Sequence, residues 1–318
     1  MKKILVLAFV LVAAIGAFAQ TPALTFGMYG DITAAVASPD SYGIYTETYL
    51  AYKAKDMGLS ATVVGGADFF AAPRNYSFWY QWCTGVKLYA GKLRETGSAR
   101  LTSYIDGNGF STRMANSQNG VMAYWNSVKN LTVAWFTPVT GVAIGNDFRG
   151  SSLGISFAVP SVVTLVTAYR SSLNLAPLDK NEFSLGADVK AIKDITLKAG
   201  LKNVGGIWSI SGFFGPTNVL YATFGQTVGD MNYGVDADFT LTPTSAYGIK
   251  GLVEYTMGKY VLGAKASIDN GDAWYNNKGL VINPYVKRNF DAGDIVVGLS
   301  YNAATTSIEL PVDFEISF

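Results

Sequence analysis

The last segment of the chain, residues 307–318, alternates apolar and polar side chains without a break. Its apolar positions are Ile308, Leu310, Val312, Phe314, Ile316 and Phe318, and its polar positions include Glu309, Asp313 and Glu315. Because successive side chains of a strand point to opposite faces, one face of this segment is apolar and the other carries carboxylates. Such a strand suits a membrane β-barrel, whose wall meets lipid on one side and water on the other. The alternative is an edge strand of a soluble β-sandwich.

The same two-residue period recurs along the chain, and no stretch has a convincing helical period. Clear examples are residues 24–36, 59–69, 231–241 and 247–257. Within each of them the charged residues keep to one face. The pattern therefore predicts an all-β fold made of strands with one apolar face.

Short and long connections alternate between these strands. The short polar links are 53–56, 127–130, 190–194, 229–230 and 291–294; the longer segments are 71–76, 95–119, 137–150, 171–180, 204–216 and 270–278. Short turns at one end and longer loops at the other are typical of a transmembrane antiparallel up-and-down β-barrel. We expect 16 to 18 strands, because residues 77–94 could form one long strand or a hairpin. Pro311 interrupts the last strand, and we expect a bulge or a lost ladder bond there.

The N-terminus has the pattern of a cleaved signal peptide, Met1–Ala19. Lys2 and Lys3 precede an apolar stretch that ends at an A-x-A cleavage pattern. The expected domains are therefore the signal peptide, 1–19, and a single outer-membrane β-barrel, 20–318. The signal peptide directs export into the periplasm, and the lipid-facing strands require a membrane. The expected location is therefore the outer membrane, reached through the periplasm.

Composition excludes several classes of function. The signal contains two of the 24 basic residues, so the mature chain has 22 against 23 acidic ones, which gives no support for nucleic-acid binding. Only Cys83 is available, so no intrachain disulfide can form. After the signal no apolar run approaches about 18 residues, the length that a helical membrane span requires.

Catalytic and metal chemistry find little support in the residues. The chain has no histidine, the usual general base. Residues 150–154 match G-x-S-x-G, but no base is available to activate the serine. Asp269–Asp272 lacks the ligand spacing of a calcium loop and is typical of a turn. We therefore expect no enzymatic activity, no catalytic residues, no cofactor and no metal site.

The signal peptide, the repeated hairpins and the last strand together resemble bacterial outer-membrane porins. In that family the barrel assembly machinery recognises a C-terminal strand that ends in Phe. The resemblance gives this role to Val312, Phe314, Ile316 and Phe318. It also implies a homotrimer surrounded by outer-membrane lipid, and a third outer loop that folds inward and narrows the pore. That loop is residues 95–119 here.

These considerations predict a water-filled channel for passive diffusion of small hydrophilic solutes and ions. Selectivity would be set by charged side chains that face the lumen. The candidates are Glu47, Lys87, Asp236 and Asp238 on the wall, and Arg94, Arg100, Asp106 and Arg113 at the constriction. Since both signs are present, we expect weak ion selectivity. The alternative is a non-conducting barrel that acts as an adhesin or a structural surface protein.

Overall fold

The computed structural model describes most of the chain from residue 23 onward. The described residues are 23–35, 42–65, 72–95, 100–107, 109–110, 112–141, 147, 150–171, 181–204, 217–241, 245–270 and 279–317. The predicted signal peptide, 1–19, and the terminal Phe318 lie outside them. In this described part, no helix has the length and apolar character needed to cross a membrane.

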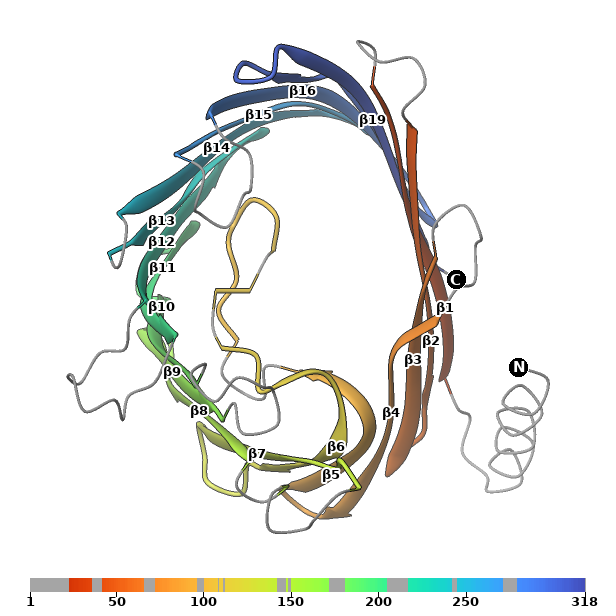
Figure 1. Ribbon diagram of the computed structural model, residues 1–318, viewed down its shortest axis with the longest axis vertical. Coiled ribbons are helices and arrows are strands. Elements are labelled where there is room, and N and C mark those ends of the chain that lie inside the picture. Colours follow the sequence, from red (N-terminus) through yellow and green to blue (C-terminus); the bar gives the residue numbers. More distant parts are fainter. Residues whose placement is uncertain are drawn as a thin grey trace.

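The described strands form one antiparallel sheet that closes into a cylinder (Figure 1). They are β1 (Ala23–Ala35), β2 (Tyr42–Lys53), β3 (Met57–Gly65), β4 (Ala72–Cys83), β5 (Val86–Glu95), β6 (Ala115–Trp125), β7 (Leu131–Pro138), β8 (Ser152–Val159), β9 (Val163–Arg170), β10 (Glu182–Val189), β11 (Ile195–Val204), β12 (Thr217–Val228), β13 (Met231–Thr240), β14 (Ala246–Met257), β15 (Tyr260–Asp269), β16 (Gly279–Phe290), β17 (Gly293–Gly298), β18 (Ser300–Asn302) and β19 (Ser307–Ser317). Each strand pairs with its neighbours in the chain, and β1 pairs with β19. Closure leaves no sheet edge, so no row of backbone groups is left unpaired in the wall. The predicted up-and-down barrel is confirmed.

β17 and β18 are two parts of one strand, so the barrel has 18 strands. Both parts pair with β16 on one side and β19 on the other, in the same register. The interruption falls where that register sets Gly298 opposite Pro311. Proline has no backbone N–H to give to the ladder. Pairing of Pro311 is therefore lost on the β17 side, without a bulge, and is kept with Thr33 of β1.

Residues 77–94 form a hairpin, which accounts for the higher of the two expected strand counts. β4 ends at Cys83, Thr84 and Gly85 make the turn, and β5 begins at Val86. Gly85 has φ of 82°, a value that few residues other than glycine adopt. The loop predicted at residues 71–76 is wrong, since β4 already pairs with β3 at Ala72. Its proline and polar residues are typical of a turn, but a register shift between Thr62 and Val63 accommodates them.

The two faces of the wall are reversed relative to those of a water-soluble protein. On β13, the outward-facing Val235 and Phe239 are 44% and 43% exposed, whereas the inward-facing Asp236 and Asp238 are 0% exposed. Large apolar side chains are exposed on strands all around the barrel. Exposed apolar surface of this extent is typical of a wall that contacts lipid.

Candidate functional site: a loop folded into the barrel

The segment between β5 and β6 runs inside the barrel (Figure 1). We call residues 96–114 loop 3; its described residues are 100–107, 109–110 and 112–114. Thr102 and Gly109 form a β-bridge, and the amide of Phe110 donates to the carbonyl oxygen of Leu101 at 2.9 Å. The described part of the loop therefore folds back on itself within the lumen, as the porin resemblance predicts.

Asp236 of β13 holds the backbone of loop 3. Its carboxylate accepts hydrogen bonds from the backbone N–H of Tyr104 at 2.9 Å and from that of Ile105 at 3.0 Å. The hydroxyl of Thr223 on β12 also donates to it. Asp236 and Thr223 are fully buried. Because each buried N–H left without a partner would cost about 1 to 3 kcal/mol, this carboxylate fixes the position of the loop.

Two glycines of the wall make room for the ring of Tyr104. The ring lies against Gly225 of β12 and Gly234 of β13, where any Cβ would overlap it. These two glycines are directly paired across the strands. The Tyr104 hydroxyl reaches further along β13 and donates to Oδ1 of Asn232. The wall is thus shaped to receive this aromatic side chain.

Apolar contacts attach the rest of the loop to the wall. Leu101 and Phe110 are fully buried against Val166, Ala168 and Tyr221. The rings of Phe110 and Tyr221 are stacked with centroids 4.7 Å apart. Such aromatic pairs contribute about 0.5 to 1.5 kcal/mol beyond their buried area. This part of the lumen is therefore a packed core and not a water-filled space.

Polar contacts complete this attachment on β10 and β11. The ammonium of Lys198 donates to the backbone carbonyl of Thr102 at 2.9 Å and to its hydroxyl at 3.1 Å. The backbone N–H of Thr112 donates to the hydroxyl of Ser184 at 2.8 Å. A second apolar cluster contains Leu93, Met114, Ala115, Met122, Ala134 and Phe136. The loop is therefore held at both of its described ends.

The tip of loop 3 carries an ionic contact to the wall. Asp106 pairs with Lys250 of β14 and with Lys265 of β15, the latter at 3.1 Å. Burial opposes ionisation of Asp106, but the hydrogen bonds and charges of the two lysines outweigh it and lower the pKa of Asp106. Asp106 is therefore a carboxylate over the whole neutral range and tethers the tip.

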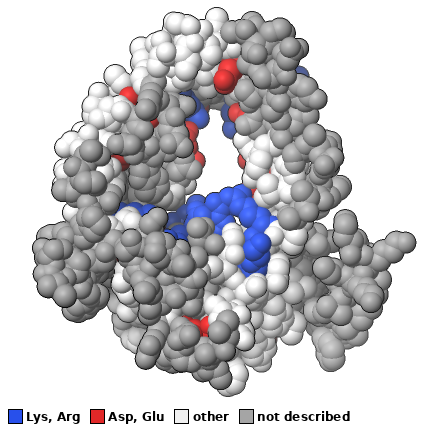
Figure 2. Space-filling view, viewed as in Figure 1, with Lys and Arg blue, Asp and Glu red and all other residues white. Residues whose placement is uncertain are grey.

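An opening passes through the molecule beside the loop (Figure 2). Basic side chains border it on one side, and acidic side chains lie on the walls around it. On the wall, Arg74 and Glu47 form an ion pair of 2.6 Å, and Lys287 and Asp294 form one of 2.7 Å. The opening is thus lined by charges of both signs.

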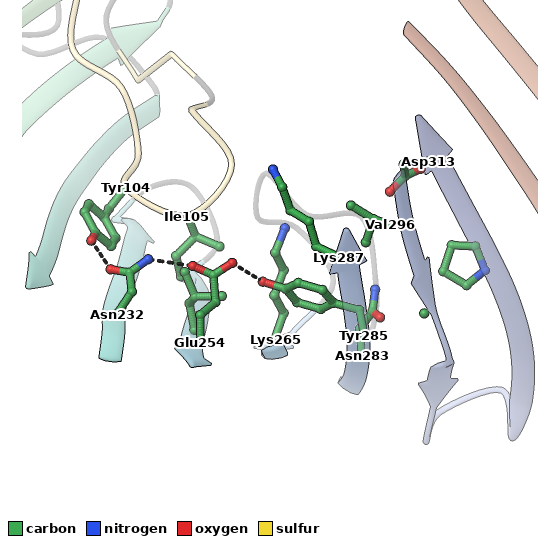
Figure 3. A pocket seen from close by; sticks show the side chains of 13 residues that line it. Tyr104, Ile105, Asn232, Glu254, Lys265, Asn283, Tyr285, Lys287, Val296 and Asp313 are labelled. Atoms are coloured by element: carbon green, nitrogen blue, oxygen red, sulfur yellow. Dashed lines mark hydrogen bonds between the residues drawn. The ribbon is translucent and has the colours of Figure 1, made fainter. Parts of the chain in front are cut away.

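A cavity of about 480 Å³ lies between the tip of loop 3 and the wall from β13 to β19 (Figure 3). Tyr104 and Ile105 border it on the loop side. On the wall, Glu254 accepts hydrogen bonds from Asn232 at 2.6 Å and from the Tyr285 hydroxyl at 2.5 Å. This cavity is bordered by loop 3 on one side and by polar side chains of the wall on the other.

The structure brings some of the candidate pore residues into the open lumen and covers others. Glu47 faces inward and is partly exposed in its pair with Arg74. Asp236 and Asp238 also face inward, but they are fully buried, Asp236 beneath loop 3. Neither contacts water in the lumen, so a lining role for them is not consistent with their burial. The alternation correctly predicted that both side chains face inward. It could not predict that loop 3 covers Asp236.

The remaining candidates lie at different depths. The Lys87 ammonium lies 3.7 Å from the ring centroid of Trp79, near the short turn after β4. Asp106 lies at the loop tip, and Arg100 is exposed on the loop. Arg113 is partly buried, and Arg94 follows a register shift in the pairing of β5 with β6. Among these residues, Asp106 joins the loop to the wall through its ion pairs with Lys250 and Lys265.

Sequence reasoning missed several residues that shape the site. Tyr104, Thr223, Asn232 and Tyr285 were not among the candidates, because they carry no charge. Their common signal is an uncharged hydrogen-bonding group at an inward position of the alternation. For Tyr104 even this signal is absent, since the loop sequence has no alternation of apolar and polar residues.

The predicted assembly residues lie on the outward face of β19. Phe314 covers Gly30 of β1, where the sheet closes, and a Cβ at that glycine would overlap its ring. Val312 and Ile316 share this face, and both are partly buried. Phe318 lies outside the described residues. A role of these residues in recognition by the assembly machinery stays a prediction.

Comparison with solved structures identifies the fold. No protein-family model and no curated protein matches the chain. A mutant of the porin of Rhodopseudomonas blastica superposes with a TM-score of 0.58 at 13% identity, covering 94% of this chain and 100% of that chain. OpdL of Pseudomonas aeruginosa superposes with a TM-score of 0.59 at 10% identity, covering 93% and 98%. The chain therefore has the barrel fold of bacterial outer-membrane porins.

Proposed function

We propose that this barrel is an open outer-membrane channel for passive diffusion of small hydrophilic solutes and ions. The observation that supports this most directly is the opening beside loop 3 (Figure 2). Loop 3 is bonded to the wall at Asp236, Lys198 and Ser184, so it narrows the lumen on one side. The charged side chains around the opening give hydrated solutes a polar path.

The wall supports the membrane location. Outward-facing aromatic side chains of β4, namely Phe78, Tyr80 and Trp82, are 38%, 41% and 68% exposed. Amphipathic rings collect where an apolar band meets lipid headgroups. Together with the porin fold, this supports a barrel in the bacterial outer membrane.

The charges of the lumen support weak ion selectivity. Several of them compensate each other locally, as in the pairs Glu47–Arg74 and Lys287–Asp294. A paired ammonium and carboxylate attract either counter-ion less than a ring of one sign does. We expect a modest reversal potential in a salt gradient.

The proposal includes two kinds of protein partner. A homotrimer is the expected assembly of porins with this fold. The barrel assembly machinery is the expected partner of Val312, Phe314, Ile316 and Phe318. Cross-linking in native membranes tests the first, and loss of the terminal residue tests the second.

Conductance of the purified barrel in planar bilayers tests the channel, with liposome swelling in sugars of graded size as a second measurement. Arg100→Glu and Arg113→Glu should shift the reversal potential toward cations if these residues line the constriction. Lys129→Glu, on an exposed short turn, is the matched control and should not shift it. A folded barrel that neither conducts nor swells liposomes would overturn the channel and favour an adhesin or a structural role.

A further inference from the structure

We propose that the cavity beneath the tip of loop 3 is a binding subsite for small zwitterionic solutes of amino-acid to dipeptide size. The inference rests on the proposed channel, because the cavity is part of its lumen. It adds a solute class and the residues that recognise it. The cavity of about 480 Å³ is large enough for a solute of this size and lies within the range of small-molecule sites.

The wall is recessed at this point because the inward position at Gly298 has no side chain. Gly263, Tyr285 and Gly298 lie in one cross-strand row of β15, β16 and β17. The Tyr285 ring lies against Gly263, and Pro311 borders Gly298 from β19. Gly298 and Pro311 are also where the ladder is interrupted. A Cβ at Gly298 would lie 2.8 Å from Oδ1 of Asn283, so a larger side chain there would narrow the recess.

Two side chains of opposite charge, Lys287 and Asp313, line the cavity from one cross-strand row of the wall. Lys287 of β16 pairs with Val296 of β17, which pairs with Asp313 of β19. Figure 3 shows Val296 between the two charged side chains. Since neighbouring strands lie about 4.8 Å apart, the Cα atoms of Lys287 and Asp313 are about 10 Å apart. This separation suits a solute with an ammonium at one end and a carboxylate at the other.

The lysines of the cavity retain hydrogen-bonding capacity for a solute carboxylate. An ammonium can donate three hydrogen bonds. The Lys287 ammonium bonds Asp294 at 2.7 Å, and that of Lys265 bonds Asp106 at 3.1 Å. Their side chains are 31% and 34% exposed, so both can reach a solute in the lumen.

Acceptors for a solute ammonium are also present. Each oxygen of Glu254 accepts one bond, whereas an ionised carboxylate offers about four acceptor sites. The buried Oδ1 of Asn283, which lines the cavity, has no hydrogen-bond partner in the described structure. A buried acceptor without a partner is rare. If the side-chain amide of Asn283 turns toward the cavity, its oxygen can accept a hydrogen bond from the solute. Carboxylates beside the lysines also disfavour a purely anionic solute.

The test uses four probes with one skeleton: glycylglycine, N-acetylglycylglycine, glycylglycinamide and N-acetylglycylglycinamide. At pH 7 these are zwitterionic, anionic, cationic and neutral. Binding to the detergent-solubilised full chain is measured by saturation-transfer NMR, and transient block of the KCl current is measured in planar bilayers. We expect glycylglycine to bind and block at concentrations at least threefold lower than the other three.

Lys287→Gln and Asp313→Asn should each weaken glycylglycine binding about threefold, the size of one partly exposed charge contact. Gly298→Val should abolish binding, because its side chain would displace the Asn283 amide and narrow the cavity, whereas Lys129→Gln should leave binding unchanged. Equal binding of all four probes, or no binding to a barrel that conducts KCl, would overturn the subsite and leave the channel standing. Absence of KCl current from the folded barrel would overturn the channel, and the NMR measurement would still decide the subsite.

Discussion

Loop 3 divides the barrel interior into two parts whose inward side chains differ in burial and polarity. On the side of the wall that loop 3 covers, the inward side chains include two buried apolar clusters, with Met122, Phe136 and Tyr221 among their members. On the side that the loop leaves uncovered, the inward side chains include charged ones that are partly exposed, such as Glu47 and Lys287. We call these the packed half and the open half. A single alternating pattern therefore produces a protein core on one side and a water-lined wall on the other.

The difference shows that the position of loop 3 is encoded by the wall. Apolar inward residues attract Leu101 and Phe110 by the hydrophobic effect, since they would otherwise face water. The polar anchors Asp236 and Lys250 then set where the loop tip stops, at the border of the open half. Changes in the packed half should accordingly alter stability, and changes in the open half should alter which ions pass.

The largest effect is expected for Asp236→Ala. Removing this buried carboxylate leaves the backbone N–H of Ile105 and the hydroxyl of Thr223 without an acceptor, and the backbone N–H of Tyr104 keeps only the Thr223 hydroxyl, at a cost of about 4 kcal/mol. The loop should detach, with a lower thermal unfolding midpoint and an unstable, larger conductance. Asp230→Ala, in an exposed turn of the same hairpin, is the control. Unchanged melting and steady currents in Asp236→Ala would show that the packed half does not depend on this anchor.

Phe110→Ala should have the next largest effect. It removes a fully buried ring stacked on Tyr221 and leaves a cavity, at a cost of about 3 kcal/mol. Calorimetry in detergent should show a lower midpoint, and single-channel records should show added current noise. Phe157→Ala removes the same ring from an exposed position on the outer face and should destabilise much less in detergent. Equal losses in both variants would contradict a packed lumen.

Asp106→Asn tests the attachment of the loop tip at the border between the packed half and the open half. Losing the ion pairs with Lys250 and Lys265 should weaken the attachment of the loop tip by about 1 to 2 kcal/mol, seen as wider current fluctuations at pH 7. Because the pKa of Asp106 is lowered, its stabilisation is present above the ordinary aspartate value of 3.8 and is lost as pH falls below it. The unmodified channel should therefore match the variant only below pH 3.8. Convergence of the two already at pH 5 would contradict the lowered pKa.

The barrel could be predicted from local pattern, because the alternation within each strand shows which of its faces is apolar and which is polar. The inward orientation of Asp236 and Asp238 followed from the alternation alone. Their burial did not, since the contact between Tyr104 and Asp236 joins residues 132 positions apart in the chain. Only the porin resemblance indicated an inward loop, and it could not indicate which half of the wall the loop would cover.

The start of β4 shows a second limit of the pattern. Pro73 and Arg74 read as a turn, yet Arg74 extends the strand by reaching Glu47 and Tyr45 across the lumen side of β2. The partner of a charged side chain on a distant strand is not visible in a local period. Tyr104 was not predicted for the same reason. Its ring packs against two glycines on the distant strands β12 and β13.

Glu47→Gln and Arg74→Gln should have the smallest effect on stability and opposite effects on ion selectivity. The pair is partly exposed, at 29% and 28%, so its loss should cost less than about 1 kcal/mol. Glu47→Gln leaves the Arg74 charge uncompensated in the open half and should shift the reversal potential in a KCl gradient toward chloride. Arg74→Gln leaves the Glu47 carboxylate and should shift it toward potassium by a similar amount. Shifts in the same direction, or a drop in melting as large as that of Phe110→Ala, would mean that this wall is not the water-lined half.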